Sequence, residues 1–458
     1  MKTENVGTIQ NKNIIVLGLA KSGLAVAKLL VRLGANVTVN ERQVRESCQG
    51  VEELEQLGIS VICGSHPTEL LEGNVSMIVK NPGIPFDIPF LQEAEKKGIP
   101  IVTEVEIAYL ISEAPIIGIT GSNGKTTTTT LIYEMLKESD REPIIAGNIG
   151  TVLSQVAETA QQDQWLVAEL SSFQLLGTDQ FRPRIATLLN VFDAHLDYHH
   201  TKEHYVFSKA RLFANQRADD VAVLNYDHEL TRGLADQLHS QIAWFSRKTD
   251  VSRGAFIQDG KIVSKDRQGN IVELVPLQEL KLIGAHNVEN ALAAVSVALE
   301  AGAKIERIRH VLTTFEGVEH RLQFVREVEG VRYYNDSKAT NSVATRKSVE
   351  SFSVPVVLIA GGLDRGDDFH ELEDLFRTRV KALVAYGQNS KKMLEVAKRI
   401  GVNQIISVDN VNEAVESAAQ FAQTGDVVLL SPASASWDQF TSFEERGDMF
   451  TQSVHKLR

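Results

Sequence analysis

A glycine-rich segment that ends in lysine and threonine is the part of this sequence most suited to chemistry. Residues 118–128 read GITGSNGKTTT and continue the apolar run PIIGIT. In such a loop the backbone N–H groups and the helix start face phosphate oxygens, the lysine adds charge, and the threonine hydroxyl can bind Mg²⁺. Gly124, Lys125 and Thr126 keep the usual core, although Ile119 stands where the first glycine is expected. The loop predicts a nucleoside-triphosphate site.

A second glycine turn lies near the N-terminus. Residues 18–23 read GLAKSG, which approximates G-x-G-x-x-G with Ala20 at the second glycine, and Glu41 ends the next expected strand. The second glycine normally lets the backbone approach a pyrophosphate closely, and the acidic residue meets a ribose. Two interpretations stay open on this motif alone, a plain strand–helix turn or a site for a diphosphate-containing ligand.

Short apolar runs alternate with stretches of helical spacing, which is typical of parallel α/β sheets. The alternation starts anew at three places and predicts three α/β domains, 1–104, 105–317 and 318–458. Ligands of such sheets bind at the carboxyl ends of the strands, where the motifs lie. We expect a helix at Ser22–Leu33 and strands at Asn13–Leu17, Val37–Val39, Met77–Val79, Pro115–Thr120, Trp165–Glu169, Ile185–Asn190, Val356–Ala360, Ala382–Tyr386 and Asp426–Leu430.

Composition narrows the class of protein. The 458 residues are 43% hydrophobic and 23% charged, with a formal net charge of −12, which argues against a broad nucleic-acid or anionic-membrane surface. Two cysteines form no disulfide framework. The polar N-terminus and the lack of a long apolar run favour a cytoplasmic protein with no membrane partner. We expect a monomer.

Further short motifs lie along the chain after the phosphate loop. They are GNIG (147–150), ELSSFQL (169–175), NVFDAHLD (190–197), GAHNVEN (284–290), HR (320–321), NDSKATN (335–341), GGLDRGDD (361–368) and SPASASWDQFTSF (431–443). Taken together with the phosphate loop, these motifs make the chain resemble the Mur ligases, from about residue 11 to about residue 450 and with the motifs in order. ELSSFQL, NDSKATN and SPASASWDQF are similar to the branch that adds D-glutamate.

The resemblance implies a Rossmann-like UDP-binding domain, a central P-loop ATPase-type domain and a C-terminal Rossmann-like domain for the amino acid. It implies ATP and Mg²⁺ as cofactors, and UDP-N-acetylmuramoyl-L-alanine and D-glutamate as substrates. ATP would convert the L-alanyl carboxylate to an acyl phosphate, which the amine of D-glutamate then attacks. This chemistry needs positive charge around several anionic groups.

The resemblance also assigns roles to individual residues. The implied catalytic residues are Lys125, Glu169, His195 and Lys209, and the implied metal ligands are Thr126, Glu169, His195 and a carbamylated Lys209. The implied ATP-binding residues are Gly118, Thr120, Gly121, Ser122, Asn123, Gly124, Lys125, Thr126, Thr127, Asn290, Arg321 and Asp336. The UDP substrate would meet Lys21, Ser22, Glu41, Arg42, Asn81 and Asn148. D-Glutamate would meet His195, Lys338, Thr340, Arg365, Ser436 and Phe443. The chain departs from its relatives at Arg42 and Ala194.

Other functions compete with this interpretation. A sister ligase would use the same architecture, but GGLDRGDD lacks the D-N-P-[RK] motif expected of a lysine- or diaminopimelate-adding enzyme. Folylpolyglutamate synthetases lack the UDP-type first domain. A regulatory nucleotide-binding protein would not need Glu169, His195 and Lys209 together. The histidines at 195, 199, 200 and 204 could suggest zinc, but a phosphate loop favours Mg²⁺, so we interpret His199, His200 and His204 as loop or surface residues.

Overall fold

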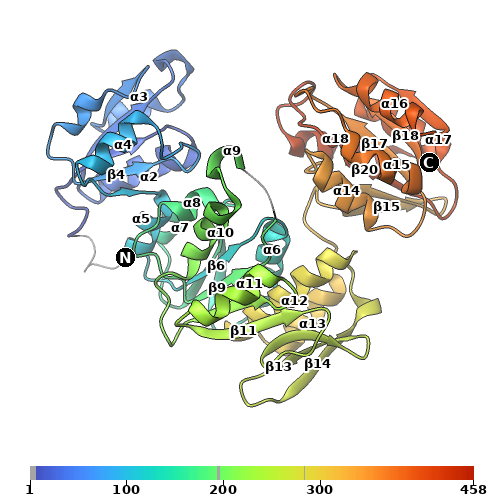
Figure 1. The fold of residues 1–458 in the computed structure, drawn as a ribbon, viewed down its shortest axis with the longest axis horizontal. Coiled ribbons are helices and arrows are strands. Elements are labelled where there is room, and N and C mark those ends of the chain that lie inside the picture. Colours follow the sequence, from blue (N-terminus) through green and yellow to red (C-terminus); the bar gives the residue numbers. More distant parts are fainter. Residues whose placement is uncertain (1–6, 193–195, 283, 458) are drawn as a thin grey trace. The chain divides into compact units, whose positions relative to one another are not determined.

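Three sheets organise the chain, with helices packed against them (Figure 1). The computed structural model describes residues 7–192, 196–282 and 284–457. Within these residues the strands form a five-stranded, a nine-stranded and a six-stranded sheet, each from a consecutive part of the chain. This confirms the predicted α/β class with three sheet-bearing regions, while the boundaries after residues 104 and 317 stay predictions.

The first sheet is parallel throughout, and the chain order reverses beside β1. Such a reversal opens a crevice at the carboxyl ends of the strands. The apolar residues of β1 are buried, as expected for a strand covered on both faces. In spatial order the strands are β3 (Ser60–Cys63), β2 (Asn36–Glu41), β1 (Asn13–Leu17), β4 (Met77–Lys80) and β5 (Ile101–Val102).

The second sheet has β6 inside it, between β9 and β8, and every residue of β6 is buried. Its far edge is an antiparallel meander, β12 to β14, which the sequence analysis did not predict. In spatial order the strands are β14 (Ile271–Pro276), β13 (Lys261–Lys265), β12 (Gly254–Gln258), β11 (Gln241–Ser246), β10 (Val221–Asn225), β9 (Ile185–Leu188), β6 (Ile116–Thr120), β8 (Gln164–Glu169) and β7 (Glu142–Gly147).

The third sheet is parallel apart from one antiparallel edge strand, β15. The predicted strands Val356–Ala360, Ala382–Tyr386 and Asp426–Leu430 correspond to β17, β18 and β20. In spatial order the strands are β15 (Gln323–Val328), β16 (Val331–Asn335), β20 (Val427–Leu430), β17 (Val356–Gly361), β18 (Val380–Tyr386) and β19 (Gln404–Ser407).

The helices fill the intervals between strands. Helix α2 matches the predicted helix to within a residue, and Gly34 follows it with a positive φ of 83°, a common way to end a helix. The helices are α2 (Lys21–Arg32), α3 (Val51–Gln56), α4 (Pro89–Lys96), α5 (Glu104–Ile111), α6 (Lys125–Leu136), α7 (Leu153–Ala157), α8 (Ser172–Leu176), α9 (Leu196–His199), α10 (Lys202–Ala210), α11 (Glu229–Leu234), α12 (Ala285–Glu300), α13 (Ile305–Thr314), α14 (Ser342–Glu350), α15 (Glu373–Arg379), α16 (Ser390–Arg399), α17 (Val411–Phe421) and α18 (Phe443–Lys456).

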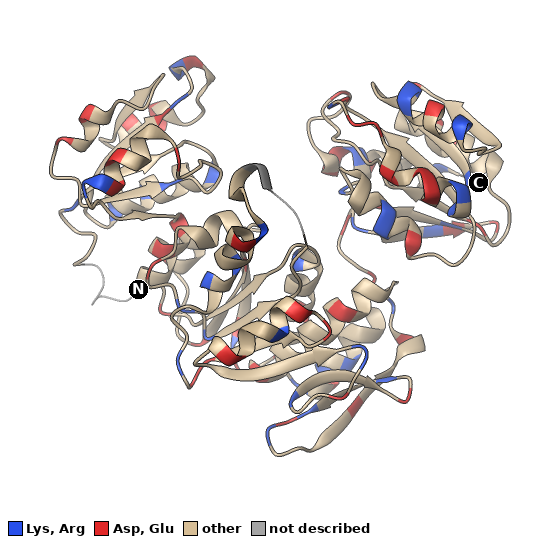
Figure 2. Ribbon diagram, in the orientation of Figure 1, with Lys and Arg blue, Asp and Glu red and all other residues tan. Residues whose placement is uncertain are grey.

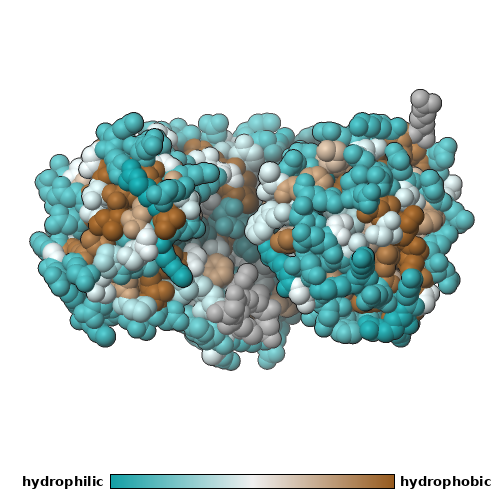
Figure 3. Space-filling model, turned by 90° about the horizontal axis from the view of Figure 1, so that it is seen from above, coloured by the Kyte–Doolittle hydropathy of each residue, from teal (hydrophilic) through white to brown (hydrophobic). Residues whose placement is uncertain are grey.

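The chain divides into two compact units. Unit 1 comprises Met1–Glu279 and Glu289–Thr313 and holds the first two sheets, and unit 2 comprises Leu280–Val288 and Thr314–Arg458 and holds the third. Figure 2 shows basic and acidic residues interspersed in both units. On the face drawn in Figure 3, teal hydrophilic residues break up the brown hydrophobic areas. Among the described residues no helix has the length and apolar content to cross a bilayer.

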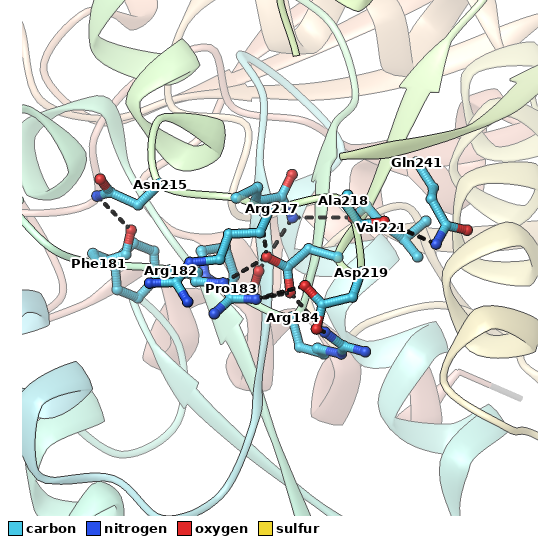
Figure 4. A network of polar contacts seen from close by, with 12 residues as sticks. Phe181, Arg182, Pro183, Arg184, Asn215, Arg217, Ala218, Asp219, Val221 and Gln241 are labelled. Carbon is cyan, nitrogen blue, oxygen red and sulfur yellow. Dashed lines mark hydrogen bonds and ion pairs between the residues drawn. The ribbon is translucent and has the colours of Figure 1, made fainter. Parts of the chain in front are cut away.

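An ion-pair network ties together the amino ends of β9 and β10 (Figure 4). Arg182 Nε donates to Asp220 Oδ2 over 2.6 Å, and Arg184 Nη1 donates to Asp220 Oδ1 over 3.0 Å. The backbone N–H of Arg217 donates to the same carboxylate over 2.7 Å. The Asp220 side chain is only 1% exposed, and its hydrogen bond raises the pKa of the Arg182 guanidinium. Because these charges satisfy one another, the network stabilises this edge of the sheet.

Candidate active site

The phosphate loop joins β6 to α6 in a conformation that requires glycine. Gly124 precedes α6 with a φ of +85°, and a Cβ there would lie 2.1 Å from Asn290 Oδ1. A side chain at 124 would therefore be strained and would collide with Asn290. The structure thus brings Asn290, predicted to bind ATP, directly against the loop. The N-terminus of the 12-residue helix α6 opens at the same place, which suits phosphate.

Asn190, which follows β9, holds the shape of the phosphate loop. Its Oδ1 accepts from the backbone N–H of Asn123 over 3.0 Å, and its Nδ2 donates to the Asn123 carbonyl over 3.2 Å. The Ser122 hydroxyl accepts from the backbone N–H of Phe192 over 2.9 Å. Thr120, predicted to bind ATP, is buried and donates to the Leu170 carbonyl over 2.8 Å, so its side chain holds the strand ends together.

Two lysines donate to one carbonyl of the loop. Lys125 Nζ lies 2.9 Å from the Gly121 carbonyl oxygen, and Lys209 Nζ lies 3.0 Å from the same atom. Lys209 sits on α10, is 2% exposed and lies 4.5 Å above the Tyr205 ring. Burial, and then the charge of Lys125, lower the pKa of the Lys209 ammonium well below its usual value. The site therefore favours a neutral Lys209 amine, the nucleophilic form.

Glu169 is the acidic centre of this site. It ends β8, is 2% exposed, and accepts from Thr126 Oγ1 at Oε2 over 2.8 Å. Its Oε1 accepts from Asn148 Nδ2 over 3.1 Å. The structure thus brings together the predicted metal ligands Thr126 and Glu169, and it places Asn148, predicted to contact the UDP substrate, beside them. A hydroxyl and a carboxylate at the start of α6 are hard oxygen donors, and they fit Mg²⁺.

The histidines differ from the sequence-based interpretation. His195, predicted as a catalytic residue and metal ligand, lies outside the described residues. His199 was interpreted as a loop or surface residue, and this is wrong, because it is fully buried between the hydroxyls of Ser172 (2.9 Å) and Ser208 (3.3 Å). Its ring stacks on Phe173 at 5.3 Å. Within the described residues, no group of three or more His, Cys, Asp or Glu is placed to hold a metal ion.

A cavity of about 910 Å³ lies at the carboxyl edge of the first sheet. Glu41 holds two lining segments of this cavity together, because its carboxylate accepts from the backbone N–H groups of Leu19 (2.7 Å) and Gln43 (2.9 Å). Lys21 Nζ donates to the Gly150 carbonyl over 3.2 Å, and Ser22 follows it in the first turn of α2. The lining includes the predicted residues Lys21, Glu41, Arg42 and Asn81, together with Cys48 and His66.

In unit 2, Asp336 is enclosed rather than open to a ligand. Ser348 and Ser431 donate to its Oδ2 over 2.5 and 2.8 Å, and the Leu322 N–H donates to its Oδ1 over 3.1 Å. Burial raises the pKa of this carboxyl group to about 6, against the lowering effect of its hydrogen bonds. The residue predicted to hold the ribose therefore joins three segments of its own unit.

Of the residues predicted for D-glutamate, Lys338, Thr340, Arg365 and Ser436 lie on loops at the carboxyl edge of the third sheet, and Phe443 begins α18. Lys338 Nζ lies 4.8 Å above the Phe443 ring, and Arg365 lies 4.8 Å above the Trp437 ring. Trp437, which was not among the predicted site residues, is 65% exposed. Among the remaining residues of this set, Ser436 is buried and Thr340 is exposed. Arg321, which was predicted to bind ATP, is half-buried.

Sequence reasoning missed a buried arginine in unit 2. Arg446 on α18 is completely buried, and it donates to Ser337 Oγ (2.9 Å), the Ser337 carbonyl (2.7 Å) and the Ser434 carbonyl (3.0 Å). It therefore clamps the residue before Lys338 to the loop that carries Ser436. A charged residue in a helix is usually exposed to solvent, so the sequence offered no reason to expect burial. The one signal was the position of Arg446 three residues after Phe443, a predicted site residue.

Family models match all three regions of the chain. The model described as the Mur ligase MurD-like N-terminal domain matches residues 12–103. The Mur ligase middle domain matches residues 119–298, and the Mur ligase glutamate ligase domain matches residues 320–434.

Curated proteins and solved structures agree with these matches. A protein of Geobacillus sp. (strain WCH70) named UDP-N-acetylmuramoylalanine–D-glutamate ligase is 53% identical over 450 residues, 98% of each chain. A protein of the same name from Bacillus subtilis is 49% identical over 456 residues, 99% of this chain and 100% of its own. Among solved structures, MurC from Thermotoga maritima covers 97% of this chain and 99% of its own at a TM-score of 0.58, and MurF from Acinetobacter baumannii covers 98% of both chains at 0.59. At 19% identity, these two structures show the shared fold. Full-length identity near one half establishes that the chain belongs to the Mur ligase family.

Proposed function

We propose that this chain is an ATP-dependent ligase that joins D-glutamate to UDP-N-acetylmuramoyl-L-alanine. The observation that supports this proposal most strongly is the 53% identity to a ligase of that name over 98% of both chains. In the reaction the L-alanyl carboxylate takes the γ-phosphoryl group of ATP and releases ADP. The amine of D-glutamate attacks the acyl phosphate, a C–N bond forms, the C–O bond to phosphate breaks, and one proton leaves the amine.

ATP would bind at the phosphate loop, where the N-terminus of α6 and Lys125 offer positive potential. Mg²⁺ fits the oxygen pair of Thr126 and Glu169, with His195 as a further predicted ligand. When bound, the ion would neutralise phosphate charge. Asn290 would contact the nucleotide from beside Gly124. A related MurF from Thermotoga maritima has been solved in complex with ADP.

Lys209 would carry a carbamate. A lysine adds CO₂ through its neutral amine, and burial beside Lys125 favours that form. The modification converts a cation into an anion next to the phosphate loop, where the free ammonium would oppose a metal ion. Lys125 would remain charged and hold phosphate oxygens.

The UDP part of the substrate would occupy the cavity lined by Lys21, Glu41, Arg42 and Asn81. Its volume of about 910 Å³ lies within the usual range for pockets of large ligands. D-Glutamate would bind in unit 2, where Arg365 presents a planar fork for one carboxylate, and Lys338 with Ser436 would hold the other. The domain boundaries, the cytoplasmic location and the monomeric state stay predictions.

Phosphate release tests this function directly. The assay contains the full chain, ATP, Mg²⁺ and UDP-N-acetylmuramoyl-L-alanine, and each D- and L-amino acid is added in turn. We expect release only with D-glutamate at appreciable rate, and none without the UDP substrate. Faster release with L-alanine, L-lysine or L-glutamate would indicate a sister ligase instead. Arg365→Ala should raise the KM for D-glutamate by about ten- to a hundredfold and leave that for ATP unchanged.

A further inference from the structure

A buried lysine, Lys80, is the last residue of β4. It directly precedes the loop of residues 81–84, which lines the cavity at the carboxyl edge of the first sheet. Lys80 is 1% exposed. Its Nζ donates to the carbonyls of Asn81 (3.3 Å) and Pro82 (3.2 Å) and to the hydroxyl of Tyr198 (3.3 Å), and it lies 4.4 Å above the Phe86 ring. These contacts use the three hydrogens of an ammonium group.

This environment is costly for a cation. The hydrogen-bond acceptors of Lys80 are neutral oxygens, and burial lowers the pKa of its ammonium to about 7. An apolar side chain of the same length would fill the space without this cost. Two of the three donors reach carbonyl oxygens of the loop, and the third reaches the hydroxyl of Tyr198.

Tyr198 approaches the same loop from α9. Its hydroxyl lies 3.1 Å from the Pro82 carbonyl and 3.1 Å from the Ile84 carbonyl, and its ring packs edge-on against Phe173 at 4.6 Å. Phe173 lies on α8, which follows Glu169 after two residues. A continuous set of contacts thus runs from the cavity loop, through Lys80 and Tyr198, to the helix beside Glu169.

The loop has little freedom on its other side. The backbone N–H of Asn81 donates to the Leu17 carbonyl over 2.7 Å, and a Cβ on Gly18 would lie 2.9 Å from Asn81 Cβ. Asn81 and Gly83 both line the cavity. The loop is therefore clamped between the first glycine turn and the Lys80–Tyr198 pair.

We propose that Lys80 and Tyr198 are positioning residues for the UDP-linked substrate, and that they align the 81–84 loop with the helices beside Glu169. The inference rests on the proposed function of the cavity. Neither residue needs to touch the reacting atoms. Their effect is to hold one wall of the nucleotide site in register with the acidic side chain of the phosphate site, so that binding and reaction geometry are set together.

The test uses two variants that retain most of the packing. Lys80→Met keeps an unbranched stem, and Tyr198→Phe keeps the ring while it removes the hydroxyl. We expect each to raise the KM for UDP-N-acetylmuramoyl-L-alanine by about tenfold, because a buried charged donor or its acceptor is lost, with the KM for ATP changed less than about twofold. Calorimetric binding of UDP to the full chain should weaken in parallel. Because the two residues share one network, the double variant should show less than the product of the single effects.

Matched controls separate positioning from general damage. Lys96→Met changes a lysine that is 74% exposed on the same domain, and Tyr226→Phe removes a hydroxyl elsewhere in unit 1; both should behave as wild type. If Lys80→Met fails to fold, Tyr198→Phe decides the question. Unchanged UDP affinity and KM in Tyr198→Phe, or an equal rise in the KM of every substrate, would overturn the inference. Failure of the wild type to bind UDP would instead overturn the proposed use of the cavity, and the inference with it.

Discussion

Gly121 offers one carbonyl oxygen to two lysines, and this shared acceptor explains how the site can use them differently. Lys125 follows the glycines at the start of α6, while Lys209 is buried on α10. Two like charges near one carbonyl are unfavourable, and the buried one loses its proton more readily. In the proposed function, the same residue type would supply a phosphate-binding cation at one position and a modifiable amine at the other.

Replacement of Lys209 tests this division of roles. Lys209→Ala should lower the rate of phosphate release by roughly a hundredfold, since loss of a group that orients a metal site costs 10- to 100-fold in typical cases. Formate or acetate in the buffer should restore part of the rate, because a small carboxylate can replace the carbamate. Lys202→Ala, an exposed change at the start of the same helix, should have no effect. Full activity of Lys209→Ala would remove the residue from the mechanism.

Asp336 predicts a pH dependence of stability in unit 2. Its pKa is 3.8 when exposed and about 6 when buried, so between these values the folded protein binds a proton that the unfolded chain releases. The contribution of Asp336 to stability is then greatest below about pH 3.8 and is lost as pH rises through about 6, by at most about 3 kcal/mol. Hydrogen exchange of β17 and β20 should show this fall, and Asp336→Asn should flatten it. The exposed Asp409→Asn should retain the wild-type profile. The same pH profile in Asp336→Asn as in the wild type would contradict the assignment.

At the scale of residues, the sequence identified groups whose chemistry depends on local spacing. Thr126 and Glu169 were predicted from motifs, and they form a 2.8 Å hydrogen bond. Long-range burial was not predictable. Lys80, His199 and Arg446 look like ordinary polar residues in the sequence, and each is buried by segments far away in the chain. Their environments arise from the tertiary fold, which no local pattern encodes.

At the scale of elements, continuous apolar runs identified several central parallel strands, but not β10, whose five residues are all buried, nor β11 beside it. NIIVL became β1 at the predicted bounds, and DVVLL became β20 with one residue fewer. The edge strands were missed, because one of their faces is solvated and their sequences are mixed. In β14, for example, the first three of the six residues, which precede Leu274, are exposed or only partly buried. Antiparallel edges also need only short turns, which resemble loops in the sequence.

The Arg182–Asp220 network should stabilise the amino edge of the second sheet. Asp220→Asn removes a buried carboxylate that accepts from two guanidinium groups and from the backbone N–H of Arg217. We expect a loss of about 2 kcal/mol in the free energy of unfolding, since hydrogen bonds to a charged group contribute about 1.5–3 kcal/mol. Asp219→Asn is the matched control, because its side chain is 63% exposed and its pairs should contribute less than about 1 kcal/mol. Chemical denaturation measures both. Equal losses of unfolding free energy in the two variants would show that the burial of Asp220 does not make its ion pairs more stabilising than those of Asp219.

At the scale of the whole molecule, the proposed ligand sites are distributed over separate sheets. The cavity proposed for the nucleotide and the phosphate loop belong to the first two sheets in unit 1, and the residues proposed for D-glutamate that the structure describes belong to unit 2. Every one of these groups lies where strands end and loops begin, as expected for open parallel sheets. The sequence predicted three such regions because each begins with its own buried strand and polar loop. It could not predict that the first two would form one compact unit, because the buried apolar cluster that joins them, which includes Val26 of α2 and Leu153 of α7, arises only in the tertiary fold.

This arrangement predicts that ligands stabilise the two units differently. UDP at a hundred times its dissociation constant should add about 2.7 kcal/mol to the stability of unit 1 through mass action. Calorimetry of the full chain should show one unfolding transition that shifts upward with UDP and another that does not. Hydrogen exchange assigns them, since β1 and β4 should gain protection while β17 and β20 keep theirs. Inorganic phosphate at matched ionic strength is the control for nonspecific anion binding. A shift confined to unit 2 would contradict the placement of the nucleotide cavity, and a single transition that moves as a whole would show that the units unfold together.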